Sequence, residues 1–262
     1  MVDGEILPCR KNRSQSGDSG DGRTCCRFDP MVIDSTRTFA QLMILVREIG
    51  NVLDAESLQM DRQTLGAYDH DAAAFAKEWE AQPVPADVYD LIGRHFDPGL
   101  TADIGCGSGR DTNWFSKNGY TAIGFDASEG LLDEARRLHP GIEFQHAALP
   151  ELNGIADGVF NNVFCETVIM HLSADAIEPS VKRLVEILRP NGTLYLSWRV
   201  TEKEDKRDDR GRLYSAFDPT LAFRALASQK ILFNDHLVSP SSGKTIQRMI
   251  VRKVGGPTRY VA

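Results

Sequence analysis

Short apolar runs and longer helical patterns alternate along the chain from about Leu65 onward. A short apolar run indicates a buried strand, whereas apolar residues three and four positions apart indicate an amphipathic helix. Regular alternation of the two is typical of a parallel sheet with helices on both faces. The pattern therefore predicts an α/β protein with a three-layer, doubly wound sheet.

The predicted elements follow one another in chain order. Two helices come first, at 72–81 and 86–95. Strands are predicted at 100–104, 121–125, 142–146, 159–165 and 193–198, and further helices at 110–118, 130–138 and 174–188. The turn-forming residues Pro190-Asn191-Gly192 separate the last of these helices from the strand at 193–198.

Two strand-like segments near the C-terminus, at 230–238 and 245–253, break this alternation. Only the turn-forming segment 239–243 lies between them. Such a short connection requires antiparallel pairing, because a parallel return needs a crossover of about a dozen residues or more. We therefore expect a mostly parallel, seven-stranded sheet that ends in an antiparallel hairpin.

The first 60 residues follow a different pattern. Residues 1–30 are rich in Gly, Ser, Asp and Arg and contain few apolar positions, a composition typical of disorder. Within 31–60, apolar residues three and four positions apart predict an amphipathic helix that packs on the domain or contacts a partner. We expect a disordered segment at 1–30, a helical appendage at 31–60, one domain at 61–254 and a tail at 255–262.

Composition and charge exclude several classes of protein. The chain has 262 residues, 42% of them hydrophobic, and no apolar run approaches the roughly 18 residues of a membrane-spanning helix. A net charge of −7 disfavours a large interface with nucleic acid. Five cysteines without CxxC spacing indicate neither a disulfide framework nor a metal site. A protein of the reducing cytoplasm is expected.

The glycine-rich turn Gly105-Cys106-Gly107-Ser108-Gly109 is the most informative segment, because it lies between the first predicted strand and its helix. Glycine lets the backbone turn sharply and approach a flat ligand. Its spacing is GxGxG, whereas the dinucleotide motif GxGxxG needs a glycine where this chain has Arg110. This difference disfavours NAD. Cys106 has no evident base partner, and we interpret it as a small spacer within a cofactor-binding turn.

Asp126 ends the second predicted strand, 21 residues beyond Gly105. A carboxylate at this place can accept hydrogen bonds from both hydroxyls of a ribose, and such charge-assisted bonds are strong. Several cofactors contain an adenosine ribose, so Asp126 does not distinguish them. It is the predicted ribose ligand.

With these motifs, residues 68–253 resemble the class I S-adenosylmethionine-dependent methyltransferases, in particular the bacterial small-molecule members of the type 11 and type 25 domain group. In that family an acidic and an aliphatic residue precede GxGxG, as Asp103 and Ile104 do here. The resemblance implies a seven-stranded sheet with its last strand inserted antiparallel, and S-adenosylmethionine as cofactor. It also implies that Asp103 and the glycines Gly105, Gly107 and Gly109 hold the methionine end.

The resemblance further implies which residues surround the adenine. Ala127 would lie beside the base, Ala148 and Leu149 would belong to its wall, and Glu166 would face the cofactor from the end of the fourth strand. Related chains often have an aspartate near 145–147 that meets the adenine amino group, but this chain has Gln145-His146-Ala147. Gln145, His146 or a backbone group could serve instead.

Three residues outside the cofactor motifs have two interpretations each. His171 follows the fourth strand, at the rim where open α/β sheets bind ligands. It either accepts a proton from the substrate as a catalytic base or anchors its loop by hydrogen bonding. Tyr68 and Trp79 precede the first strand, where they either form an aromatic lid or pack in the core.

The charged run 202–212 follows the fifth strand. Such runs are usually solvated loops, but its place on the carboxyl rim also suits a substrate loop. In that case Arg199, Arg212 and Tyr214, together with Tyr68, are candidates to hold an anionic acceptor.

These observations predict methyl transfer from S-adenosylmethionine to an acceptor, which the acidic charge balance suggests is a small molecule. The methyl group is already activated, so alignment of the two reactants can supply most of the catalysis and acid–base groups are not obligatory. Two alternatives remain. A nicotinamide-dependent oxidoreductase should show GxGxxG, and a non-catalytic methyltransferase-like binding module should show a damaged glycine motif.

Overall fold

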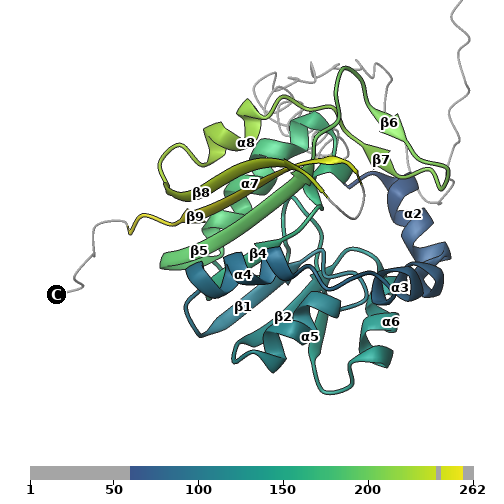
Figure 1. Cartoon of the computed structure of the whole chain (residues 1–262), viewed down its shortest axis with the longest axis horizontal. Coiled ribbons are helices and arrows are strands. Elements are labelled where there is room, and N and C mark those ends of the chain that lie inside the picture. The colour runs from purple at the N-terminus through teal and green to yellow at the C-terminus, as the bar shows by residue number, and fades with distance from the viewer. Residues whose placement is uncertain (1–59, 240–242, 256–262) are drawn as a thin grey trace, which may run out of the picture. The chain divides into compact units, whose positions relative to one another are not determined.

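The computed structural model describes residues 60–239 and 243–255. The segments expected at 1–30 and 31–60 therefore lie outside the described residues except for Met60, and so does the expected tail except for Gly255. Within the described ranges the chain forms a seven-stranded sheet in the order β3-β2-β1-β4-β5-β9-β8 (Figure 1). Its strands are β1 (Leu100–Ile104), β2 (Thr121–Asp126), β3 (Glu143–His146), β4 (Phe160–Cys165), β5 (Leu188–Arg199), β8 (Lys230–Val238) and β9 (Thr245–Arg252).

Helices precede and connect these strands. They are α2 (Arg62–His70), α3 (Ala72–Glu80), α4 (Ala86–His95), α5 (Arg110–Lys117), α6 (Glu129–Leu138), the short 3₁₀ turn η1 (Ile169–His171), α7 (Ala174–Glu186) and α8 (Thr220–Ala225). A separate two-stranded hairpin pairs β6 (Lys206–Arg207) with β7 (Leu213–Tyr214). Among the helices of the described ranges, none is both long and apolar enough to cross a bilayer.

Strand pairing confirms the predicted topology. Strands β1 to β5 pair in parallel, whereas β9 lies between β5 and β8 and runs antiparallel to both. The hairpin of β8 and β9 therefore completes a mostly parallel sheet, as the short connection between them predicts.

Alternate residues of the central strands contact helices on opposite faces of the sheet, since strand side chains alternate in direction. Phe164 of β4 and its register neighbour Tyr195 of β5 pack with residues of α4 and α5. The adjacent pair, Val163 and Leu194, packs in the cluster that contains α7 and α8. Both faces are covered, which confirms the three-layer, doubly wound class.

The structure corrects the boundary between α7 and β5. The helix expected to reach Leu188 ends at Glu186, and β5 begins at Leu188 rather than at Thr193. The residues expected to form a turn, 190–192, instead lie within β5, where its pairing with β4 is irregular. Asn191 takes a positive φ of 64° and donates its amide to the Lys253 carbonyl, which keeps this stretch attached to the sheet.

Candidate active site

A cavity of about 920 Å³ lies at the carboxyl ends of the parallel strands. Ligands bind at this edge of open α/β sheets. The structure brings most of the predicted site residues together in its wall. They are Tyr68, Gly105, Cys106, Gly107, Asp126, Ala127, Ala148, Leu149, Glu166, His171, Arg199, Arg212 and Tyr214. Two predicted residues, Asp103 and Gly109, lie outside this lining.

The glycine turn presents bare backbone to the cavity. Gly105, Gly107 and Gly109 have φ of 75°, 55° and 81°, a region that residues with a Cβ atom rarely adopt. A Cβ atom on Gly105 would overlap the Val168 side chain, and one on Gly107 would lie 2.8 Å from Cζ3 of Trp79. Only glycine therefore fits at these positions, and the Trp79 ring packs directly against the main chain at Gly107.

Asp126 connects this turn to the next helix. Its Oδ2 accepts a hydrogen bond from the Gly107 amide at 2.9 Å, and its Oδ1 accepts one from the Ser128 amide at 2.9 Å. Burial raises the pKa of the Asp126 carboxyl, and the backbone donors oppose that rise. Each carboxylate oxygen retains a second lone pair, so Asp126 can still accept hydrogen bonds from a ligand.

Asp103 lies behind the turn. Its side chain is 2% exposed and accepts a hydrogen bond from the Thr112 hydroxyl at 2.6 Å, which joins β1 to α5. Burial and the nearby Asp111 raise the pKa of the Asp103 carboxyl. Gly109 begins α5 as its N-cap. Both residues lie behind the turn and do not line the cavity. Their contact with the methionine end of the cofactor stays a prediction.

Cys106 contributes a buried thiol whose pKa is raised by burial and by the charges of Asp126 and Asp103. A thiol in this environment stays protonated and is a poor nucleophile. Its packing beside Leu132 and Phe144 agrees with the interpretation of a small spacer.

On the side expected to hold adenine, Ala127, Ala148 and Leu149 line the cavity. The two side chains considered as adenine ligands point elsewhere. Gln145 donates to Glu143 at 2.5 Å, and the His146 ring nitrogen Nε2 lies 3.1 Å from the Ala127 carbonyl oxygen. Neither lines the cavity as far as the described residues define it, which leaves backbone groups as the better candidates.

Glu166 lies where β4 ends and faces the cavity. Its carboxylate accepts a hydrogen bond from the Ser197 hydroxyl of β5 at 2.5 Å. Burial raises the pKa of Glu166, and the hydrogen bond from Ser197 lowers it. A carboxylate fixed between two strands can receive a donor from a ligand without rearrangement.

His171 is 4% exposed and uses both of its ring nitrogens. Nδ1 lies 2.5 Å from the Leu213 carbonyl oxygen, so Nδ1 carries the proton and donates it. Nε2 is then an acceptor, and the Tyr68 hydroxyl donates to it at 3.1 Å. Burial lowers the pKa of His171 to about 4. This arrangement favours the anchoring interpretation, since a base with no free nitrogen cannot reach a substrate.

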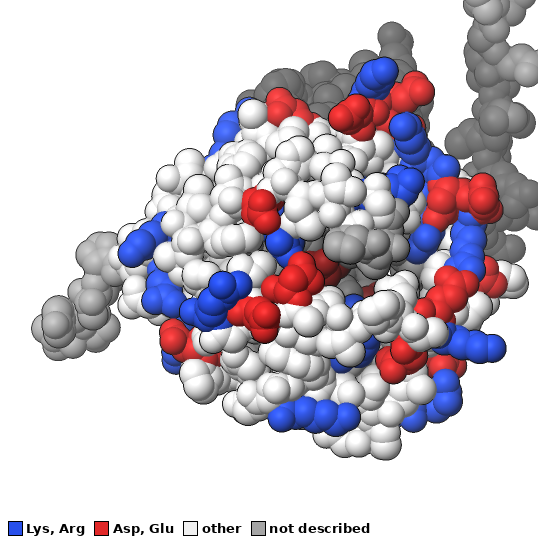
Figure 2. Space-filling model, viewed as in Figure 1, with Lys and Arg blue, Asp and Glu red and all other residues white. Residues whose placement is uncertain are grey.

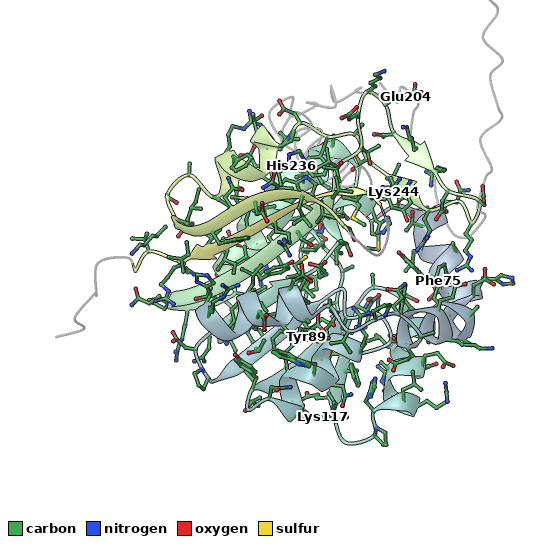
Figure 3. All side chains as sticks on the ribbon, viewed as in Figure 1. Phe75, Tyr89, Lys117, Glu204, His236 and Lys244 are labelled. Carbon is green, nitrogen blue, oxygen red and sulfur yellow. The ribbon has the colours of Figure 1, made fainter. Side chains whose placement is uncertain are left out.

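Helices α2 and α3 supply an aromatic cluster beside the cavity. The Tyr68 ring lies 5.0 Å from the ring of Phe75, which is labelled in Figure 3, and 6.1 Å from that of Trp79. Burial raises the pKa of Tyr68 to about 12, so its phenol stays neutral. Tyr68 and Trp79 both line the cavity while packing against one another, so the lid and core interpretations are compatible.

Arg212 lies over this cluster. Its guanidinium is 4.8 Å from the Phe75 ring centroid, forms a 2.6 Å ion pair with Asp208 and donates to the Tyr68 hydroxyl at 3.3 Å. The charged run 202–212 is thus not a freely solvated loop. It contains β6 and leads into β7, and the hairpin they form packs against α2.

Several charged lining residues were not predicted from the sequence, among them Arg110, Asp111, Asp87 and Arg248. Arg248 is 8% exposed although it belongs to a strand with polar neighbours. The sequence around Arg248 does not indicate that this residue is buried, because β9 is buried by its insertion between β5 and β8. Asp111 offered a clearer signal, since it lies two residues after the glycine turn, in the first turn of α5.

The family described as "Methyltransferase domain" matches residues 102–192 through its sequence model. This stretch runs from β1 into β5 and includes the glycine turn, Asp126 and Glu166, which the structure places around one cavity. The chain contains a class I methyltransferase domain.

Two curated relatives are similar to parts of this chain. A trans-aconitate 2-methyltransferase of Methylobacterium nodulans is 33% identical over 132 residues, which cover 48% of this chain and 48% of the relative. A putative methyltransferase of Geobacillus sp. is 28% identical over 107 residues, covering 39% and 43%. The matched parts thus span about half the length of these relatives.

Among solved structures, the 1,6-didemethyltoxoflavin-N1-methyltransferase of Burkholderia thailandensis is similar with a TM-score of 0.57 and 21% identity. The match covers 73% of this chain and 88% of that one. At this identity the likeness establishes the fold of the methyltransferase domain.

Proposed function

We propose that the protein is an S-adenosylmethionine-dependent methyltransferase that acts on a small-molecule acceptor. One observation carries the proposal: the bare backbone of the glycine turn and the Asp126 carboxylate face the same cavity, and Asp126 is hydrogen-bonded to Gly107 of that turn. A flat adenosine cofactor needs both a close approach to the main chain and an acceptor for ribose hydroxyls. The solved Burkholderia relative holds S-adenosylhomocysteine, which agrees with this cofactor.

The residues present fit this cofactor and have distinct roles in the proposal. Asp126 accepts from the ribose, Ala127, Ala148 and Leu149 form the adenine wall, and Glu166 receives a donor of the cofactor. When bound, S-adenosylmethionine supplies an activated methyl group. The chain's own contribution is to hold the acceptor in line with that group and to exclude water, and such positioning can supply about 7–11 kcal/mol of the barrier.

No strong base is needed for this chemistry, and the residues agree with that. His171 has a pKa of about 4 and Tyr68 one of about 12, so neither gains or loses a proton readily near neutral pH. We propose that His171 positions Tyr68 and the segment at Leu213 and that it does not accept the substrate's proton.

A small-molecule acceptor is supported by the size of the cavity and by the name of the Methylobacterium relative, which methylates trans-aconitate. On the face seen in Figure 2, Lys and Arg side chains lie among Asp and Glu side chains, an arrangement that does not favour a polyanion. The described cysteines, Cys106 and Cys165, are free and buried, and we place the activity in the cytoplasm.

Calorimetry with S-adenosylhomocysteine, S-adenosylmethionine and NAD tests the proposed function. We expect both sulfur compounds to bind and NAD to give no heat of binding. NAD binding without a response to the sulfur compounds would support the oxidoreductase alternative instead. Binding of the cofactor without methyl transfer to any of a broad set of metabolites would support the non-catalytic alternative.

Asp126→Asn tests the predicted ribose ligand. The variant keeps one oxygen acceptor but loses the charge, so we expect its affinity for S-adenosylhomocysteine to fall by about tenfold or more. Asp133→Asn on the exposed face of α6 is the matched control and should bind as the wild type does. Equal affinity in both variants would remove Asp126 from the site.

A further inference from the structure

Within the described ranges, four arginines line the cavity: Arg110, Arg199, Arg212 and Arg248. Three of them are neutralised by carboxylates of the protein. Arg110 pairs with Asp111, Arg212 with Asp208, and Arg248 with Asp87 and Asp235. Among the described residues, Arg199 alone of the four has no carboxylate within 4.0 Å.

Arg199 is held in place without a counter-ion. It ends β5, and its guanidinium lies 4.4 Å from the Tyr214 ring centroid. The Tyr214 ring in turn packs edge-on against His171, with centroids 5.0 Å apart. A cation–π contact attracts the charge but leaves its N–H donors unsatisfied, whereas a planar carboxylate can accept two of them at once.

We propose that Arg199 binds a carboxylate of the methyl acceptor, so that the substrate is a small organic acid. This inference rests on the proposed function. One guanidinium balances a single negative charge, whereas a phosphate monoester carries about −1.5 to −2 and would need a second cation. The other lining arginines are already paired, and Lys244 is engaged as well. A monoanionic carboxylate is therefore the better match.

The carboxylate of the cofactor's methionine end is the alternative partner for Arg199. The sheet order separates the two sites, since β4 lies between β1, which leads into the glycine turn, and β5, which ends in Arg199. Arg110 begins α5 directly after the turn, so it is the cation nearer in the chain to the predicted methionine end. This placement assigns Arg199 to the acceptor side of the cavity.

Arg199→Met tests the proposal by removing the charge while keeping an unbranched apolar side chain. The probes are the monocarboxylates benzoate, cinnamate and butyrate, each with its neutral amide, titrated by calorimetry into the full-length protein saturated with S-adenosylhomocysteine. We expect at least one acid to bind about tenfold tighter than its amide, and Arg199→Met to abolish this preference. Affinity for S-adenosylhomocysteine should stay within about twofold of wild type. Arg224→Met, an exposed arginine of α8 paired with Glu178, is the matched control.

The outcomes separate the two proposals. If wild type does not bind S-adenosylhomocysteine, the proposed function fails. If wild type binds S-adenosylhomocysteine but binds the amides as tightly as the acids, or binds no acid, the proposal of an acidic acceptor fails while the proposed function stands. A loss of S-adenosylhomocysteine affinity in a folded Arg199→Met variant would assign Arg199 to the cofactor and also overturn it. Arg199→Lys, which keeps the charge, should retain the preference for acids, and this variant decides the matter if Arg199→Met does not fold.

Discussion

His171 couples the chemistry of one side chain to the stability of the protein. Its Nδ1 proton is donated to the Leu213 carbonyl and its Nε2 accepts from Tyr68, so protonation of the ring breaks a hydrogen bond and charges a buried site. The pKa of about 4 lies below the ordinary value of 6.5. Between pH 6.5 and 4 the unfolded chain therefore binds a proton that the folded chain does not.

We predict that the free energy of unfolding falls as the pH drops from 6.5 to 4, by up to about 3 kcal/mol from His171. In His171→Asn the amide can still donate to Leu213 but does not titrate, so this part of the pH dependence should vanish. Urea denaturation at several pH values measures it. His236→Asn on β8, whose side chain is exposed, should keep the wild-type slope. A slope unchanged in His171→Asn would contradict the assigned hydrogen bonds.

A second prediction at this scale concerns Gly107. An alanine there would place its Cβ atom 2.8 Å from Cζ3 of Trp79, and the ring would have to move. We expect Gly107→Ala to weaken binding of S-adenosylhomocysteine by about tenfold or more. Gly119→Ala is the matched control, because Gly119 also has a positive φ, of 89°, but no atom lies within 4 Å of its added Cβ. Equal cofactor affinity in the two variants would show that space above the turn is unimportant.

The two residues differ in how far the sequence could predict them. Gly107 was predictable, since its motif is local and implies its conformation. The rim position of His171 was predictable as well. Its tautomer and burial were not, because its partner Leu213 lies 42 residues away in a segment without a clear pattern.

At the scale of elements, the hairpin of β6 and β7 is attached to α2 at several points. The buried Thr64 hydroxyl donates to Asp61 at 2.7 Å and accepts from the Leu213 amide at 2.8 Å. Both nitrogens Nη1 and Nη2 of Arg207 lie 2.8 Å from carboxylate oxygens of Asp61. The hairpin and α2 therefore form one unit beside the cavity.

Thr64→Val tests this unit. The substitution keeps the shape of the side chain but leaves the Leu213 amide without its acceptor, which costs about 1–3 kcal/mol. We expect that loss of unfolding free energy, together with faster hydrogen exchange at 206–214. Thr121→Val, at the exposed start of β2, should change neither quantity. Unchanged exchange in the hairpin of Thr64→Val would mean that α2 does not hold it.

Hydrophobic pattern explains which elements the sequence could predict. Strands β1 to β4 and helices α3 to α6 have clear periodicity and were found within a few residues. The hairpin of β6 and β7 escaped prediction because its residues are mainly charged and it is stabilised by ion pairs and hydrogen bonds to α2. The six-residue helix α8 is too short for a helical period to be recognised.

At the scale of the whole molecule, every described lining residue of the cavity lies between Met60 and Arg248. We predict that a chain beginning at Met60 binds S-adenosylhomocysteine within about threefold of the full chain, since the glycine turn, Asp126 and Glu166 all follow that residue. Calorimetry on both chains measures this. A folded shorter chain without affinity would show that residues 1–59 contribute to the site.

The position of β9 between β5 and β8 has a consequence for how the chain folds during synthesis. Strand β8 leaves the ribosome before β9, yet it reaches the sheet only through β9. Until β9 is made, β5 is paired with β4 on one side only, and its other edge is open. Open strand edges can pair with other chains. The last strand to emerge therefore closes the sheet, and protection against self-association comes only at the end of translation of this domain.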